Sequence, residues 1–185
     1  MKRIVIGLVA AALLAVSIAV SAQATVYEKF RWEDEWSFPE DCGFPIQVTG
    51  SGSGVFVLRE GKNKDDGVFP YLDRFKYHET WTNPTTGEWF VIRGNAIFNE
   101  VKATRVEGNV FEFRSVEAGQ PFVVEDSDGN VVERNSGSVH VTFLFDNGGD
   151  DKPGGTYLDV IDVRVAGPHP SLEKDPCDYA AELIG

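Results

Sequence analysis

From residue 44 onward, apolar and polar residues alternate along short segments, and clusters of turn-forming residues interrupt the alternation. A period of two places successive side chains on opposite faces of a strand, and turn clusters about 8–12 positions apart are typical of all-β domains. This pattern restricts the fold more than any other feature of the sequence. It predicts an all-β domain with at most a helical turn or two, over residues 178–183.

The alternation predicts roughly eight or nine strands, joined mostly by short connections and therefore antiparallel. The run Gly50–Gly54 consists of glycine and serine alone, so we expect a flexible break between two of these strands. Short consecutive connections favour an up-and-down meander, which must close or split to bury its apolar face. We expect a closed or nearly closed barrel, and the alternative is a two-sheet β-sandwich.

Residues 96–106 and 110–116 form a predicted hairpin around Gly108-Asn109, a sequence that suits a two-residue turn. A turn of this length sets Val106 opposite Phe111, and Arg105 opposite Glu112. The first pair is apolar and the second joins opposite charges, so the chemistry of both pairs favours this register.

The first 24 residues have the pattern of a secretory signal peptide. Lys2 and Arg3 precede an apolar run over residues 4–20, and Ala22 and Ala24 supply the small residues that signal peptidase recognises. A membrane anchor is the alternative, because the apolar run approaches the roughly 20 residues that a span requires. The basic start, the alanine content and the small residues favour cleavage after Ala24 and secretion of the protein.

The remaining chain divides into three parts. Residues 25–43 are rich in aromatic and acidic side chains, and we interpret them as an N-terminal arm or an extra strand over a barrel end. An aromatic contact surface for a partner is the alternative for this segment. Residues 44–166 form the predicted β-barrel domain, and residues 167–185 form a C-terminal tail.

The two cysteines, Cys42 and Cys177, lie near opposite ends of this region. A lone pair of cysteines in an exported protein is usually a disulfide. A redox-active pair is disfavoured, because the acidic neighbours of both residues would raise the thiol pKa values. We therefore expect a structural disulfide that ties the tail back to the domain.

Acidic residues outnumber basic ones by 29 to 17, which gives a formal net charge of −12. Such a surface repels nucleic acid and anionic membranes, so we expect neither as a partner, and no membrane contact after signal cleavage. The sequence lacks phosphate-binding and nucleophile motifs, and its three histidines lack the spacing of a zinc site. We expect a monomer without a cofactor.

Two carboxylates lie on faces that are otherwise apolar. Glu79 alternates with Tyr77 and Trp81, and Asp159 alternates with apolar residues of the last predicted strand. If both faces point inward, desolvation raises the two pKa values, and the groups become candidates for general acids or ligand anchors. Tyr77, Trp81 and Arg93 are then candidate ligand-binding residues. The alternative is that a bulge turns one acid outward, or that Arg93 or Tyr77 bonds to them.

An acidic loop near the C-terminal strands supplies candidate calcium ligands. Asp146, Asp150 and Asp151 offer the carboxylate oxygens that calcium prefers. The alternative is that these residues only form the turns of the loop.

Three stretches of the chain form a further pattern: residues 42–48 (CGFPIQV), residues 78–87 (HETWTNPTTG), and residues 166–170 (AGPHP) followed by Asp175-Pro176-Cys177. Together they resemble a broad group of uncharacterised secreted proteins of actinobacteria. Proteins of this group have a β-rich body and one cysteine near each end. The resemblance implies export and pairing of the two cysteines, and it implies no activity.

Three functional hypotheses follow. The first is a secreted β-barrel module that binds either a small apolar molecule in its lumen or an extracellular protein on its surface. The second is a barrel enzyme of the isomerase or cyclase type that uses Glu79 and Asp159. The third is an extracellular structural or interaction protein without a small-molecule site.

Overall fold

The computed structural model describes residues 25–61 and 67–185. The predicted signal peptide, residues 1–24, lies outside the described residues. Among the residues that the structure describes, no helix is long and apolar enough to cross a membrane.

The described residues form one antiparallel sheet of eight strands, so the predicted all-β meander is confirmed. Neighbours in the sheet follow the chain in the order β1-β2-β3-β4-β5-β7-β8, and the short strand β6 pairs with β5 as well. The strands are β1 (Val26–Asp41), β2 (Pro45–Arg59), β3 (Tyr71–Thr82), β4 (Trp89–Glu107), β5 (Val110–Glu125), β6 (Val131–Arg134), β7 (Gly137–Asp146) and β8 (Thr156–Ala166).

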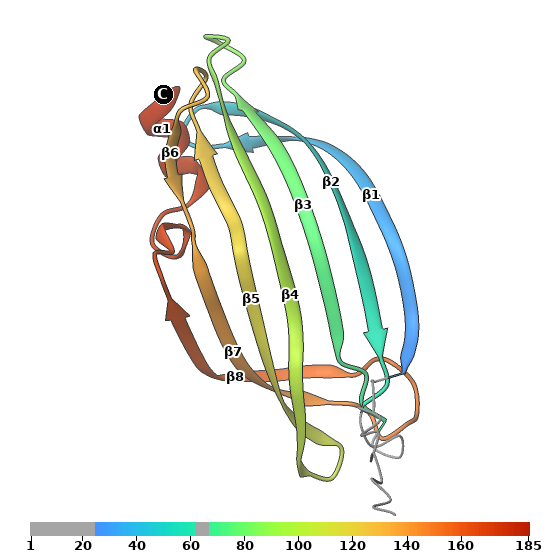
Figure 1. Cartoon of the computed structure of the whole chain (residues 1–185). Coiled ribbons are helices and arrows are strands. Elements are labelled where there is room, and N and C mark those ends of the chain that lie inside the picture. The colour runs from blue at the N-terminus through green and yellow to red at the C-terminus, as the bar shows by residue number, and fades with distance from the viewer. Residues whose placement is uncertain (1–24, 62–66) are drawn as a thin grey trace, which may run out of the picture.

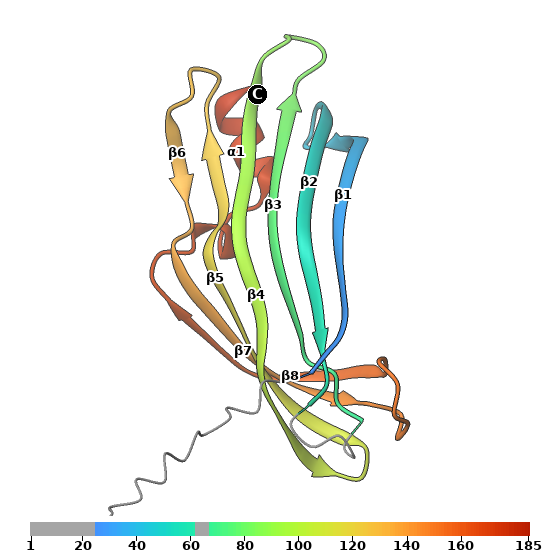
Figure 2. The ribbon, with the colours of Figure 1, turned by 45° about the vertical axis from the view of Figure 1, so that its right-hand side comes forward.

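The sheet is coiled but does not close into a barrel, because β1 and β8 are its two edges. It is also one sheet rather than a two-sheet sandwich. Two register shifts between β7 and β8, after Thr142 and after Leu144, bend and twist this edge. The β7–β8 hairpin therefore passes beneath the lower ends of β1 and β2, and β8 does not run alongside β1 (Figures 1 and 2).

Residues 26–41 of the segment interpreted as an N-terminal arm form β1, which pairs with β2 along its length. The glycine–serine run is not a break, since β2 continues through it. The indole of Trp36 lies over Gly50, where an added Cβ would be 2.4 Å from Trp36 Nε1. Trp32 covers Gly54 in the same way. The glycines therefore make room for indole rings, and packing keeps the strand extended.

The upper end of the sheet, as drawn in Figure 1, is covered by α1 (Pro176–Leu183). Asp175 caps this helix by accepting hydrogen bonds from the N–H groups of Cys177 and Asp178. A short 3-10 helix, η2 (Pro170–Leu172), precedes it. Buried residues of the helix region pack on one face of the sheet, here called the inner face; this core contains Ile46, Val48, Trp81, Phe90, Ile92, Val124, Tyr179, Ala180 and Ile184.

The Cys42–Cys177 disulfide is present and joins the start of α1 to the chain just before β2. It connects residues that are 135 positions apart in the sequence. The tail is therefore held against the upper end of the sheet by a covalent bond as well as by apolar packing.

The predicted register of the β4–β5 hairpin is wrong by one residue. Arg105 lies opposite Phe111, because a bulge at Val106 interrupts the pairing. The Arg105 guanidinium carbon lies 4.6 Å from the centre of the Phe111 ring, and Val106 is 59% exposed. A cation–π contact thus replaces the expected apolar pair.

Replacement of both cysteines by alanine tests how much the covalent link stabilises the fold. We expect the free energy of unfolding to fall by up to about 4–5 kcal/mol, because the link restricts a long loop in the unfolded chain. Urea denaturation of the double variant and of the wild type measures the difference. An unchanged unfolding midpoint would contradict a stabilising role for the link.

Candidate functional site

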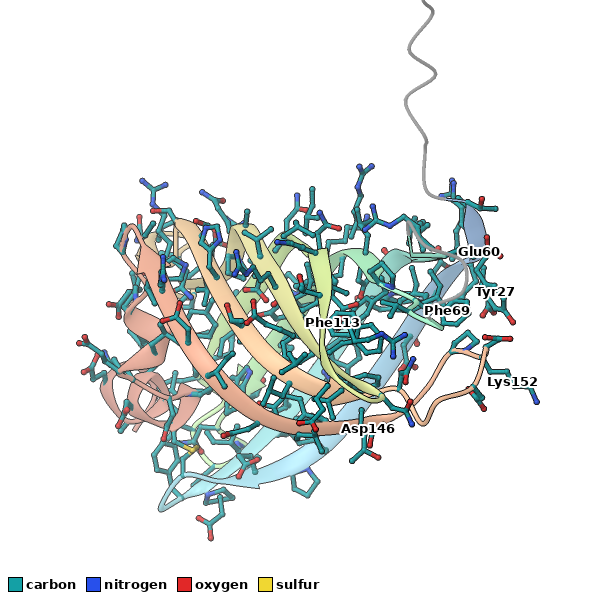
Figure 3. The ribbon with its side chains drawn as sticks, turned by 90° about the horizontal axis from the view of Figure 1, so that it is seen from below. Tyr27, Glu60, Phe69, Phe113, Asp146 and Lys152 are labelled. Carbon is teal, nitrogen blue, oxygen red and sulfur yellow. A yellow bond between two sulfur atoms is a disulfide. The ribbon has the colours of Figure 1, made fainter. Side chains whose placement is uncertain are left out.

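A cavity of about 340 Å³ lies at the lower end of the inner face. Its walls come from β2–β5, β7 and β8, from the segment Gly67–Phe69, and from the loop between β7 and β8. Asn147 Nδ2 of this loop donates a hydrogen bond to the Gly67 carbonyl oxygen (3.0 Å), which holds the two covering segments together. Figure 3 looks into this end, with Phe113 inside the coiled sheet and Phe69 near its rim.

Aromatic residues are the largest group in the walls. Phe113 stacks on Phe143 with ring centres 5.4 Å apart, and it meets Phe145 edge-on at 5.6 Å. Tyr157 contacts Phe143 at 5.7 Å and is 53% exposed, so it lies at the outer side of the cavity. The six aromatic residues of the walls are Phe69, Tyr71, Phe113, Phe143, Phe145 and Tyr157.

One carboxylate, that of Glu100 on β4, also lines the cavity. The pairing of β4 with β5 shifts after Glu100, and the extra residue Val101 is 57% exposed while Glu100 is only 8% exposed. This bulge marks the point where the inward residues of β4 change from even to odd numbers. Glu100 is the last inward residue before it.

The Glu100 side chain has few polar contacts. Its Oε2 accepts a hydrogen bond from the Tyr71 backbone N–H (2.9 Å), and the described residues offer no other hydrogen bond to the carboxylate. Burial raises the pKa of Glu100 to about 7, against the opposing effects of this hydrogen bond and of the Arg59 charge. Arg59 donates to Asn99 Oδ1, and among the described residues no ion pair within 4.0 Å joins it to Glu100.

The carboxylate predicted at position 79 lies higher on the inner face and has a structural role. Glu79 Oε1 accepts the indole N–H of Trp36 (3.0 Å), and its Oε2 accepts that of Trp81 (3.1 Å). Trp81 is buried in the core under α1. The Tyr77 hydroxyl donates to the Pro121 carbonyl oxygen (3.0 Å) on β5. These three predicted residues therefore lie together, but outside the cavity.

The other predicted site residues lie apart from this group. Asp159 is exposed on the edge strand β8, and three strands separate β8 from β3 in the sheet. The structure does not bring Asp159 and Glu79 together. Arg93 forms an ion pair with Glu125 (2.5 Å) at a partly exposed position.

The acidic loop forms turns. Asp146 Oδ1 accepts the Gly148 N–H (2.9 Å), and Asp150 Oδ1 accepts the Lys152 N–H (3.1 Å). Asp151 is exposed. In the described part of the chain, no group of three or more histidine, cysteine, aspartate or glutamate side chains is arranged to hold a metal ion.

Sequence reasoning missed Glu100, although a signal was present. Glu100 shares one face of β4 with Ala96 and Phe98, so it is a carboxylate on an otherwise apolar face. The same pattern singled out Glu79.

Comparison with protein-family models, curated proteins and solved structures found no match to this chain.

The pH dependence of stability tests the environment of Glu100. The folded protein holds this proton more tightly than the unfolded chain, so the contribution of Glu100 to stability falls as the pH rises from about 4.5 to about 7. Glu100→Gln removes this loss, because glutamine does not ionise. We therefore expect the free energy of unfolding of the variant, minus that of the wild type, to rise by about 3 kcal/mol from about pH 4 to about pH 8.

Urea denaturation at both pH values measures this shift. Glu125→Gln is the matched control with the opposite sign, because the hydrogen bond from Arg93 lowers the pKa of Glu125. A constant difference between Glu100→Gln and wild type across this pH range would rule out a desolvated carboxyl at position 100.

Proposed function

We propose that this protein is an exported binding protein that holds a small, largely apolar ligand in the cavity beneath the β7–β8 hairpin. One observation carries the proposal: a cavity of about 340 Å³ with six aromatic rings and one buried carboxylate in its walls. Ligand sites are typically about 300–1,000 Å³ in volume, mostly apolar, and supplied with a few polar groups that orient the ligand. The volume suits a molecule with one or two rings.

Export is supported by the sequence of residues 1–24 and by the Cys42–Cys177 disulfide, since such bonds persist mainly in oxidising compartments. The resemblance to secreted actinobacterial proteins agrees with this part of the proposal. An exported binding protein also fits the acidic composition, which favours solubility.

The contacts of Glu79 favour binding over the isomerase or cyclase hypothesis. Both Glu79 oxygens accept indole N–H groups, and Asp159 lies on a distant strand. A general acid must reach the reacting group of its substrate. These two carboxylates therefore offer no common substrate position, whereas the cavity offers a partly enclosed position for a ligand.

Binding of the neutral fluorescent dye N-phenylnaphthylamine tests the proposal. Its fluorescence rises in an apolar environment, and we expect saturable enhancement with wild-type protein. Leu58→Trp places a larger side chain in the cavity wall and should weaken dye binding by about tenfold or more, which corresponds to about 1.4 kcal/mol.

Leu172→Trp is the control, because it adds the same indole at an exposed position of η2 outside the cavity. Tyr157→Ala, at the exposed side of the cavity, should also lower the affinity for the dye, and it leaves the buried core residues unchanged. Non-saturable fluorescence, or equal affinity in all four proteins, would leave an extracellular protein without a small-molecule site as the better hypothesis.

A further inference from the structure

We infer that the ligand of this cavity is an organic cation, in which a positively charged nitrogen is joined to an apolar group. The inference rests on the proposed function, because it names the class of ligand for the same cavity. Its basis is the combination of a buried carboxylate, which no ion pair within 4.0 Å compensates among the described residues, and aromatic rings that line the same cavity.

The carboxylate of Glu100 lacks sufficient compensation for its burial. The described residues give it one hydrogen bond, from the Tyr71 N–H to Oε2, and none to Oε1. A buried ionised carboxylate is costly unless it is paired and hydrogen-bonded. A cationic ligand would supply the missing charge.

The aromatic walls favour the same ligand. The face of an aromatic ring carries negative electrostatic potential and attracts ammonium groups within about 6 Å, most strongly where water is excluded. Phe113, Phe143 and Tyr157 form a connected set of rings in the cavity. Glu100 and these rings line one partly enclosed cavity, so one ligand can contact both.

The positive charges near the cavity do not replace the ligand. Arg59 donates to Asn99 Oδ1 and does not line the cavity, and its charge offsets only part of the effect of burial on the pKa of Glu100. Lys152 is exposed on the β7–β8 loop (Figure 3), and it follows Asp150 and Asp151 in the sequence. The chain as a whole has a net charge of −12, which raises the local concentration of cations.

Other ligand classes fit the cavity less well. An anion would meet the Glu100 carboxylate, and no lysine or arginine lines the cavity among the described residues. A neutral apolar molecule would displace water from the carboxylate without supplying an opposite charge, and the lost hydration would weaken its binding. A cation is the class of ligand that both the Glu100 carboxylate and the aromatic rings attract.

Two compounds of the same shape separate charge from size. Phenyltrimethylammonium carries a positive charge, and tert-butylbenzene is its neutral counterpart. Competition against N-phenylnaphthylamine at about pH 8, where Glu100 is mostly ionised, measures both affinities. We expect the cation to bind wild-type protein about tenfold more tightly than the neutral compound.

Glu100→Gln should reduce the affinity for phenyltrimethylammonium about tenfold and change that for tert-butylbenzene much less. Glu117→Gln is the matched control. Glu117 is a half-buried carboxylate on the adjacent strand β5, opposite Phe98, but it does not line the cavity. This variant should keep the wild-type preference for the cation.

The outcomes distinguish this inference from the proposed function. Equal or weaker binding of the cation than of tert-butylbenzene in wild-type protein overturns the inference and leaves the cavity as a neutral-ligand site. A preference that survives in Glu100→Gln, or disappears equally in Glu117→Gln, also overturns it. Failure of the dye and of both compounds to bind overturns the proposed function itself. The wild-type comparison needs no variant, so it stands even if Glu100→Gln does not fold.

Discussion

The structure depends on how one long apolar sheet face is covered, because the described residues supply a single α-helix, of eight residues, to cover it. A sheet of this size must hide its apolar side, and α1 reaches only the upper part of the inner face. The disulfide fixes that cover in place. At the lower end the sheet covers itself, because Phe143 and Phe145 from β7 pack against a buried cluster of Val68, Phe111 and Phe113.

The two ends differ in how completely the inner face is filled. At the upper end and in the middle, large rings lie over glycines of neighbouring strands, and the Tyr77 ring occupies the space beside Gly94 as Trp36 does beside Gly50. These rings donate their polar hydrogens to Glu79 and to Pro121, so the polar groups there are satisfied within the fold. At the lower end a cavity remains, and Glu100 has a single hydrogen bond. A buried carboxylate with a single hydrogen bond therefore lines the one part of the inner face where the described side chains leave a cavity of about 340 Å³.

Alternation along the sequence was sufficient to predict the strands, but it did not reveal the bulges and the coiling that form the cavity. The strand β3, Tyr71–Thr82, follows directly from its alternation, because no bulge interrupts its period of two. The bulges at Val101 and Val106 depend on pairing with β5, which a single strand does not reveal. The same limit applies to closure, since the shifts that turn β8 away from β1 arise from its pairing with β7. Glu100 was visible as an acid among apolar neighbours, but its enclosure required the tertiary structure.

Titration of the Glu100 side-chain carboxyl by carbon-13 NMR, in the free protein and with saturating phenyltrimethylammonium, is the most direct measurement of the central claim. We expect the free protein to titrate at about pH 7, because burial disfavours the carboxylate, and the bound cation to move the titration to lower pH by stabilising it. Titration of the free protein near the ordinary glutamate value of 4.5, or a midpoint unchanged by the cation, would contradict a desolvated cation-binding carboxylate at this position.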